Sequence, residues 1–311
     1  MDSLAAPSPF TTADRVGFVG LGVMGRGMAR CLLRSGYSVA ASTRRIEIAE
    51  SFRAEGVEIT PNAGSLGQSC RLVVLCVSDA PAVEDVLFGP DGLASRLAAG
   101  ACVIDTSTIA PASARDFGTR LAERGIHLLD APITGGQEGA ARGTLTCMVG
   151  GSEAVFEACR APASTFASNY FYAGAQGAGQ AVKACNQVMV TNTLLGVAEA
   201  IVLARSQGVD PKLMREILLT GSARSMVLEK HTKKLLDESF TPGFRTSLMR
   251  KDLRLALATA LDAGATLPGA ERAESLLDAM CNAGRADWDW CAIALELQRE
   301  AGLDAPQRIE P

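Results

Sequence analysis

The sequence has few histidines, lacks cysteine pairs with metal-binding spacing, and carries no excess of positive charge. It has two histidines, His127 and His231, and none of its nine cysteines forms a Cys-x-x-Cys pair. We therefore expect no zinc site or other metal site. The formal net charge of −4 at pH 7 argues against a nucleic-acid surface or a polybasic membrane contact. An acidic small molecule stays compatible with this charge, because a basic pocket can lie within an acidic protein.

Targeting and membrane segments are also missing from the pattern. No apolar run approaches the ~20 residues needed to cross a bilayer. Met1–Asp14 is rich in Ala, Ser, Pro and Thr, without a basic start or an apolar centre, which indicates a disordered leader and not a signal peptide. The odd cysteine count and the placement of most cysteines in apolar runs indicate a reducing compartment. We expect a soluble cytoplasmic protein.

Strand-like and helical patterns alternate in the first half of the chain. This alternation predicts an α/β Rossmann-type domain over residues 15–176, with a doubly wound parallel sheet. Its strands are predicted at Arg15–Val19, Tyr37–Ser42, Leu72–Val77, Cys102–Asp105, Ile126–Asp130 and Leu145–Val149. Its helices are predicted at Met24–Ser35, Ala82–Leu87, Leu93–Ala99 and Ala112–Arg124.

The second half has helical periodicity without strand-like runs. We predict an all-α domain over residues 177–311, entered at the flexible step Gly177-Ala-Gly179. Its helices are predicted at Gln180–Ser206, Lys212–Thr220, Met226–Glu238, Thr246–Ala263, Leu267–Ala283 and Trp290–Ala301.

A glycine-rich segment follows the first predicted strand and opens a helix. Its first glycine allows a tight turn, its second lets backbone approach a pyrophosphate, and its third lets the helix pack on the strand. The helix N-terminus favours phosphate through its N–H groups and its dipole. The alternative is a glycine-rich turn without a ligand. The predicted dinucleotide contacts are Gly20, Leu21, Gly22, Val23, Met24 and Gly25.

The end of the second predicted strand bears on the choice of cofactor. An acidic residue there would bind the ribose 2′-hydroxyl of NAD, but the chain reads Ser42-Thr43-Arg44-Arg45 and has no carboxylate before Glu47. Two hydroxyls and a guanidinium suit a 2′-phosphate. We therefore favour NADP over NAD, with contacts from Ser42, Thr43 and Arg44. The alternative is that Arg44 and Arg45 only begin a solvated helix.

Five segments resemble the β-hydroxyacid dehydrogenase family, of the 3-hydroxyisobutyrate dehydrogenase type, in order and spacing over nearly the whole chain. The resemblance implies an NAD(P)-dependent oxidoreductase with the two domains predicted above. The segments are Gly20–Ala29; Asp105–Thr108 with Pro111; Asp130–Gly136, continuing to Gly151; Gly177–Gly179 with Lys183–Gln187; and Lys251–Leu257.

Within the family, further segments resemble tartronate semialdehyde reductases, also called 2-hydroxy-3-oxopropionate reductases. This resemblance implies reduction of tartronate semialdehyde to glycerate and the reverse oxidation of the hydroxyacid. Succinic semialdehyde, glyoxylate and methylmalonate semialdehyde are alternatives of the same class. The segments are Lys183-x-x-Asn186-Gln187, Gly221-x-Ala-Arg-Ser225, Leu228-Glu-x-His231 and Phe240-x-Pro-Gly-Phe244.

The chain departs from the family pattern at two positions. Thr134 stands where serine is usual, and its extra methyl group narrows the expected pocket. Gln187 stands where many members have asparagine, and its amide reaches further. Both departures bear on the identity of the substrate more than on the reaction.

Lys183 is the predicted general acid and base. It stands in a mostly apolar helical segment, where partial desolvation would lower its pKa towards neutrality and let it protonate an alkoxide. The alternative is a surface lysine whose stem lies along apolar neighbours. Gln187, four residues on, lies on the same helix face and is predicted to contact the substrate. Asn186, three residues on, lies close to that face and is predicted either to orient Lys183 or to contact the substrate.

Other predicted site residues lie at strand ends and turns. Ser107 follows a strand and is expected near the nicotinamide or the substrate, with helix capping as the alternative. Thr134, Gly135 and Gly136 form a turn suited to a carboxylate, although glycines also occur in plain loops. The resemblance adds cofactor contacts at Val77, Ser78, Thr108 and Lys251.

Two other functions remain open from the sequence. An imine reductase shares the glycine fingerprint and an arginine after the second strand, but such enzymes generally lack the catalytic lysine. A non-catalytic NADP-binding sensor or scaffold would have little need of Lys183, Ser107 and the glycine turn together. The long apolar helices predict a homodimer or homotetramer.

Overall fold

The structure is a computed structural model that describes residue 5 and residues 7–302. It divides into two compact units, Met1–Lys183 (unit 1) and Ala184–Pro311 (unit 2). The division falls inside the long helix α8 (Ala178–Ser206), a few residues after the predicted step at Gly177-Ala-Gly179. Gly177 has a φ of +90°, a conformation that favours glycine, and α8 begins at the next residue.

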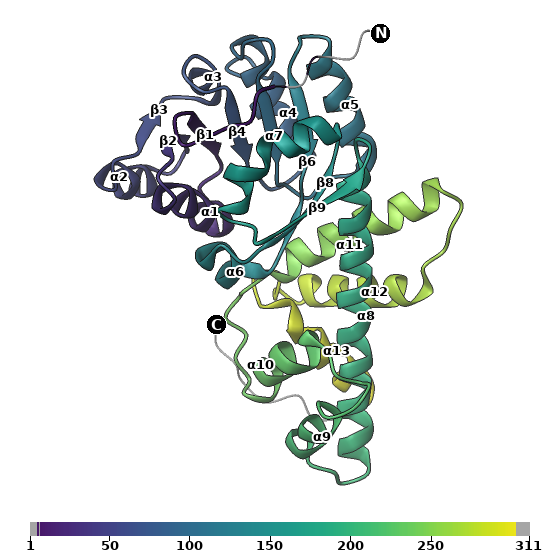
Figure 1. Cartoon of the computed structure of the whole chain (residues 1–311). Helices are drawn as coiled ribbons and strands as arrows, with labels where there is room; N and C mark the ends of the chain where they lie inside the picture. Colours follow the sequence, from purple (N-terminus) through teal and green to yellow (C-terminus); the bar gives the residue numbers. More distant parts are fainter. Residues whose placement is uncertain (1–4, 6, 303–311) are drawn as a thin grey trace. The chain divides into compact units, whose positions relative to one another are not determined.

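Unit 1 is built on one sheet with strand order β3-β2-β1-β4-β5-β6-β8-β7, and β9 pairs with β8 (Figure 1). Neighbours from β3 to β6 are parallel, whereas β8 is antiparallel to β6 and β7 and parallel to β9. The predicted Rossmann-type α/β domain is confirmed. The strands are β1 Arg15–Val19, β2 Ser38–Ser42, β3 Glu58–Thr60, β4 Leu72–Leu75, β5 Cys102–Asp105, β6 His127–Asp130, β7 Ile133–Thr134, β8 Thr146–Gly150 and β9 Asn169–Gly174.

Helices cover both faces of this sheet because successive strand side chains point to opposite sides. Val74 packs in one core with Phe52, and Val73 packs in the other with Phe117. Continuous apolar strands are therefore buried on both faces, as expected for a doubly wound sheet. The helices of unit 1 are α1 Val23–Arg34, α2 Ile46–Ala54, α3 Ala63–Leu66, α4 Ala80–Phe88, the 3₁₀ turn η1 Leu93–Ser95, α5 Pro111–Ala122, α6 Gly136–Arg142 and α7 Glu153–Ser164.

Several elements of unit 1 differ from the sequence prediction. The strand at Leu145–Val149 is not the last, because β9 follows it. Most residues of β9 are exposed or half-buried, so it lacks the apolar run of a central strand. The helix expected over Leu93–Ala99 is a short 3₁₀ turn, and Gly136, expected in a turn, begins α6.

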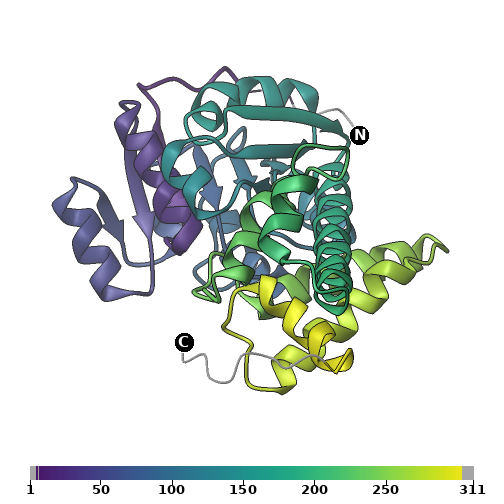
Figure 2. The same cartoon turned by 90° about the horizontal axis from the view of Figure 1, so that it is seen from below.

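Among its described residues unit 2 is helical and has no strand beyond one isolated β-bridge between Arg245 and Asp289, which agrees with the predicted all-α domain. Its core joins residues from successive helices, such as Leu194, Leu253, Leu277 and Ile293. Helices α11 and α12 pack side by side (Figures 1 and 2). After α8 the elements are α9 Pro211–Leu218, the π-helical turn η2 Val227–His231, α10 Thr232–Leu236, α11 Thr246–Asp262, α12 Pro268–Asn282, the 3₁₀ turn η3 Trp290–Ala292 and α13 Ile293–Glu300.

Helix α8 corrects the expectation that no apolar run has membrane-spanning length. It has 29 residues, and its most apolar 18-residue window has a mean hydropathy of 1.5. Its length and composition alone make it a candidate membrane span, and the core helix of a soluble protein can have the same length and composition. Leu194, Ala198 and Ile201 are buried in the core of unit 2, so packing accounts for part of its apolar character, whereas Met189 and Leu203 of the same helix are exposed.

The described part of the expected leader packs on unit 1. Phe10 is 1% exposed and belongs to the unit 1 core, and its N–H donates to Ala158 O over 3.0 Å. The Arg71 guanidinium lies over its ring. This differs from the expected disorder for residues 7–14, because a buried aromatic ring anchors the segment. Residues 1–4 and 6 lie outside the described part.

Candidate functional site

The glycine segment adopts the geometry that a dinucleotide needs. Gly20 has a φ of +96°, and a Cβ there would lie 2.1 Å from Cys76 O. A Cβ on Gly25 would lie 2.0 Å from Gly20 O, so helix and strand approach backbone to backbone. A Cβ on Gly22 would meet nothing within 4 Å, and no side chain caps α1 there. The open space and the uncapped helix N-terminus fit a pyrophosphate.

The residues expected at the adenosine end lie together after β2. Ser42 and Thr43 are half-buried, and Arg44 is exposed. Thr43 Oγ1 accepts from Arg45 N over 3.3 Å, and Arg45 is the N-cap residue of α2. Arg44 directly follows Ser42 and Thr43 in the chain and is exposed, and a guanidinium with two hydroxyls suits a phosphate group.

Ser107 joins the loops that follow β4 and β5. Its Oγ accepts from Val77 N over 3.0 Å, and its own N–H donates to Asp105 Oδ1 over 2.9 Å. Ala110 is the N-cap of α5 and makes no side-chain cap, so helix capping by Ser107 is wrong. Val77, Ser107 and Thr108 all follow the carboxyl ends of neighbouring strands, where ligands bind in such sheets.

Lys183 is buried in unit 1, with 7% of its surface exposed. Its Nζ donates to the backbone oxygen of Ile133 over 3.0 Å. The next residues are Thr134, which is half-buried, and Gly135 and Gly136, which are exposed and have φ values of +127° and +68°. The structure thus places Lys183 beside the predicted carboxylate-binding turn, and the alternative of a surface lysine is wrong.

Asp130 is a buried carboxylate for which the sequence predicted no role of its own. It is fully buried at the end of β6. Its Oδ1 accepts from Gly177 N over 2.7 Å and from Gln176 Nε2 over 3.0 Å, and its Oδ2 accepts from Gln180 N over 2.9 Å. Burial raises the pKa of Asp130 to about 6, and the backbone N–H groups oppose this rise.

Gln180 is the second residue near the predicted site that was not predicted from the sequence. It is 1% exposed; its Nε2 donates to Ser107 O over 2.8 Å, and its Oε1 accepts from Ile109 N over 3.2 Å. A polar residue in the first turn of an apolar helix was the available signal, since a buried amide needs partners.

The site residues predicted in unit 2 are linked to one another through the side chains of Gln187 and Asp252. Gln187 is 3% exposed; its Nε2 donates to Asp252 Oδ2 over 2.8 Å, and its Oε1 accepts from Asn186 Nδ2 over 2.7 Å. Lys251 Nζ lies 3.0 Å from Asp252 Oδ1. Asp252 therefore contacts both Gln187 and the predicted cofactor lysine, and Asn186 joins the group through Gln187.

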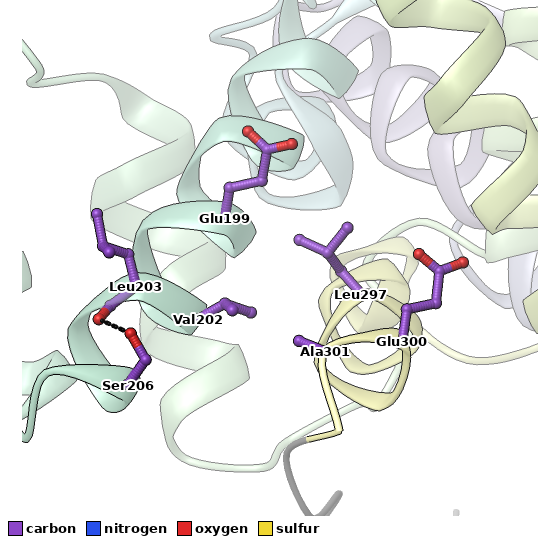
Figure 3. Close-up of a pocket in the computed structure, with 7 residues that line it drawn as sticks. All are labelled: Glu199, Val202, Leu203, Ser206, Leu297, Glu300 and Ala301. Carbon is purple, nitrogen blue, oxygen red and sulfur yellow. Dashed lines mark hydrogen bonds between the residues drawn. The ribbon is translucent and has the colours of Figure 1, made fainter.

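A shallow hollow of about 420 Å³ lies between α8 and α13 in unit 2 and contains none of the predicted site residues (Figure 3). Two of its lining residues are glutamates, and the carboxylate of Glu300 is paired with the guanidinium of Arg272. It is lined by Glu199, Val202, Leu203, Ser206, Leu297, Glu300 and Ala301. Within the described residues, no cluster of three or more His, Cys, Asp and Glu side chains has the arrangement of a metal site.

In a comparison with known proteins, each of the two parts of the chain matches a domain of a dehydrogenase. Residues 15–174 match the NAD-binding domain of 6-phosphogluconate dehydrogenase, and residues 177–297 match the NAD-binding domain of NADP-dependent 3-hydroxyisobutyrate dehydrogenase. The 2-hydroxy-3-oxopropionate reductase of Escherichia coli is 35% identical over 91% of this chain and 97% of its own. The NAD-dependent L-serine dehydrogenase of Pseudomonas aeruginosa is 33% identical over 90% of this chain and 96% of its own.

Solved structures agree with these relatives. Psf3, in complex with NADP+ and 2-OPP, has a TM-score of 0.83 and 29% identity, covering 91% of this chain and 99% of its own. The imine reductase of Myxococcus stipitatus has a TM-score of 0.63 at 19% identity, which shows a shared fold alone. The glycine geometry and these matches support dependence on NAD(P). The chain belongs to the NAD(P)-dependent β-hydroxyacid dehydrogenases, the family of 3-hydroxyisobutyrate dehydrogenase.

Proposed function

We propose that the protein reduces a short aldehyde bearing a carboxylate at the expense of NADPH, and that Lys183 is the general acid. Tartronate semialdehyde, giving glycerate, is the proposed substrate. The observation that carries the proposal is the buried ammonium group of Lys183, held 3.0 Å from Ile133 O at the start of the Thr134–Gly136 turn. NADPH, when bound, supplies the hydride.

Lys183 is suited to move the proton of this reaction. The carbonyl oxygen of the aldehyde gains negative charge as carbon accepts hydride, and the ammonium group donates a proton to that oxygen. In the reverse direction the neutral amine accepts the proton of the hydroxyl group. The bond to Ile133 O orients Nζ beside the Thr134–Gly136 segment, and an ammonium group carries three N–H donors.

The segment Thr134–Gly136, which leads from the end of β7 to the first residue of α6, is the proposed anchor for the substrate carboxylate. Gly135 and Gly136 are exposed and have positive φ values, which lets successive backbone N–H groups converge on one anion. Thr134 adds a hydroxyl donor and a methyl group. The methyl group favours a short substrate, which supports tartronate semialdehyde and glyoxylate over the longer succinic semialdehyde.

NADP is the proposed cofactor in preference to NAD. Arg44 is exposed at the end of β2 beside Ser42 and Thr43, and this edge has no carboxylate before Glu47. A guanidinium forms charge-assisted hydrogen bonds with the 2′-phosphate, whereas a carboxylate would repel it. Gly20–Gly25, Val77, Ser78, Thr108 and Lys251 complete the proposed cofactor contacts.

The test is the loss of NADPH absorbance, and then of NADH absorbance, with tartronate semialdehyde. Lys183→Ala is expected to lower kcat about 10²- to 10⁴-fold without changing the Kd for NADPH. Lys212→Ala, at an exposed lysine of α9, is the matched control and should retain full activity. If the wild type binds NADPH but reduces none of the four candidate aldehydes, the proposed reaction is wrong, and cyclic imines become the next substrates.

We also propose that the protein is cytoplasmic and assembles as a homodimer or homotetramer. Unit 2 exposes large apolar side chains: Met189 is 67% exposed, Leu203 62%, Leu213 51% and Ile217 58%. Exposed apolar groups of this size favour association with a second copy. Sedimentation velocity tests the assembly, and a monomer at micromolar concentration would contradict it.

A further inference from the structure

We propose that Asp130 and Gln180 are positioning residues that fix where the ammonium group of Lys183 lies; this inference rests on the proposed role of Lys183. Asp130 ends β6, and Gln180 lies in the first turn of α8, three residues before Lys183. Neither residue needs to touch the substrate. Both act on the reaction by setting the place of the proton donor.

Asp130 fastens the start of α8 to the end of β6. Its carboxylate accepts two backbone N–H groups, from Gly177 over 2.7 Å and from Gln180 over 2.9 Å. The first N–H groups of a helix have no partner within the helix, and a buried carboxylate stabilises them strongly. Each carboxylate oxygen bonds one of these groups, so both the position and the rotation of the first turn are defined.

The backbones around Asp130 leave no room for α8 to slide. A Cβ on Gly179 would lie 2.3 Å from Met148 O and 2.5 Å from Asp130 O. A Cβ on Gly150 would lie 2.5 Å from Asp130 Oδ1. Glycine at both positions allows this close approach of β6, β8 and α8. The register of the helix against the sheet is therefore defined by contact as well as by hydrogen bonds.

The next strand along the chain, β7, supplies the partner of Lys183. Ile133 follows Asp130 by three residues, and its backbone oxygen accepts from Lys183 Nζ over 3.0 Å. Asp130 thus holds the beginning of α8, while Ile133 receives the side chain one turn further along the helix. A loosened first turn would shift Nζ relative to Ile133 and to the Thr134–Gly136 turn, and small misplacements of a reacting group are costly for catalysis.

Gln180 extends this arrangement to Ser107. One side-chain amide donates to Ser107 O over 2.8 Å and accepts from Ile109 N over 3.2 Å. Both partners are backbone groups of the loop after β5, so the amide links that loop to α8 at two points. Gln180 therefore fixes the loop that carries Ser107, a predicted substrate residue, to the helix that carries Lys183.

The experiment compares wild type, Asp130→Asn, Gln180→Ala and the control Asp116→Asn, at an exposed aspartate of α5. Kinetics use tartronate semialdehyde and NADPH, and the Kd for NADPH is measured by fluorescence. Acetylation of Lys183 by acetic anhydride is followed by mass spectrometry, with Lys212 as the internal reference. Labelling reports the position of Lys183 without depending on activity.

The proposal expects kcat to fall about 10- to 100-fold in Asp130→Asn, with the KM for aldehyde and the Kd for NADPH within about twofold. Lys183 should label several-fold faster than in wild type, while Asp116→Asn matches wild type in every measurement. Unchanged kcat and unchanged labelling in a folded Asp130→Asn protein would overturn the positioning role.

Two further comparisons distinguish a variant that fails to fold from a failure of the proposed function. If Asp130→Asn does not fold, Gln180→Ala decides, because it leaves the bonds of Asp130 in place: lower kcat at unchanged NADPH Kd supports the proposal, and wild-type kcat overturns it. If wild type reduces no aldehyde, the proposed function fails, and Lys183 labelling alone still decides whether Asp130 positions that side chain.

Discussion

The side-chain amide of Gln187 donates to the carboxylate of Asp252 over 2.8 Å within unit 2. Both residues are 3% exposed, and Lys251 Nζ lies 3.0 Å from the other carboxylate oxygen. A buried carboxylate depends on such partners, because it has lost its hydration. Gln187 therefore stabilises a buried charge in addition to its predicted contact with the substrate.

Gln187→Asn should destabilise the protein, because the shorter amide no longer reaches Asp252. We expect the free energy of unfolding to fall by about 1–3 kcal/mol, the usual effect of leaving a buried polar group without its partner. Urea unfolding measures the change. Gln207→Asn, at an exposed position, should stay within about 0.5 kcal/mol of wild type. Equal stability of the two variants would contradict this role of Gln187.

Arg44→Ala should weaken binding of NADPH and leave binding of NADH unchanged. Loss of a charge-assisted pair with the 2′-phosphate corresponds to a rise of about tenfold or more in the Kd for NADPH. Fluorescence titration with each cofactor measures the effect. Arg53→Ala, at an exposed arginine in the last turn of α2, is the control. Equal losses for both cofactors would show that Arg44 does not read the phosphate.

Two glycine substitutions should change stability in opposite directions. A Cβ on Gly27 of α1 would lie 2.7 Å from the carbonyl carbon of Ala140 in α6, so Gly27→Ala should cost about 1–3 kcal/mol through overpacking. A Cβ on Gly196 of α8 would meet nothing within 4 Å, so Gly196→Ala should add about 0.5–1 kcal/mol. Thermal unfolding compares the two, and a shift of the same sign would refute the packing argument.

Asp130 should make stability depend on pH. Burial raises its pKa to about 6, above the ~3.9 of an unfolded aspartate. Because the pKa is higher in the folded protein, the contribution of Asp130 to the free energy of unfolding is fully present below pH ~4. It falls by roughly 2–3 kcal/mol as the pH rises through about 6. Asp105 opposite it in β5, Cys147 in β8 and Arg115 against Gly177 also face this region.

Asp130→Asn is the control for these neighbours, because it removes one titrating group and leaves the rest. Relative to the variant, the wild-type protein should lose free energy of unfolding as the pH rises from 4 to 7. Urea unfolding at intervals of half a pH unit measures it. A difference that is constant with pH would contradict the raised pKa.

Much of unit 1 could be predicted from local patterns. Central strands such as Leu72–Leu75 are short apolar runs bounded by turns, and the glycine spacing of Gly20–Gly25 predicts its place between a strand and a helix. Strand β9 could not be found this way, because an edge strand buries few side chains and has no distinctive pattern. The burial of Phe10 was hidden for a similar reason, since a single aromatic residue in a polar segment has no periodicity.

The site separates into what composition and spacing determine and what only folding decides. The sequence by itself determined the residue types: a lysine in an apolar helix, a glycine turn, and an arginine without a nearby carboxylate. The tertiary structure decided their partners. Gln180 bonds Ser107 across 73 positions of the chain, and Lys183 bonds a backbone oxygen 50 positions away. A backbone acceptor is the same at every residue, so no side-chain pattern can mark it, and only the packing of α8 on the sheet brings it to Lys183.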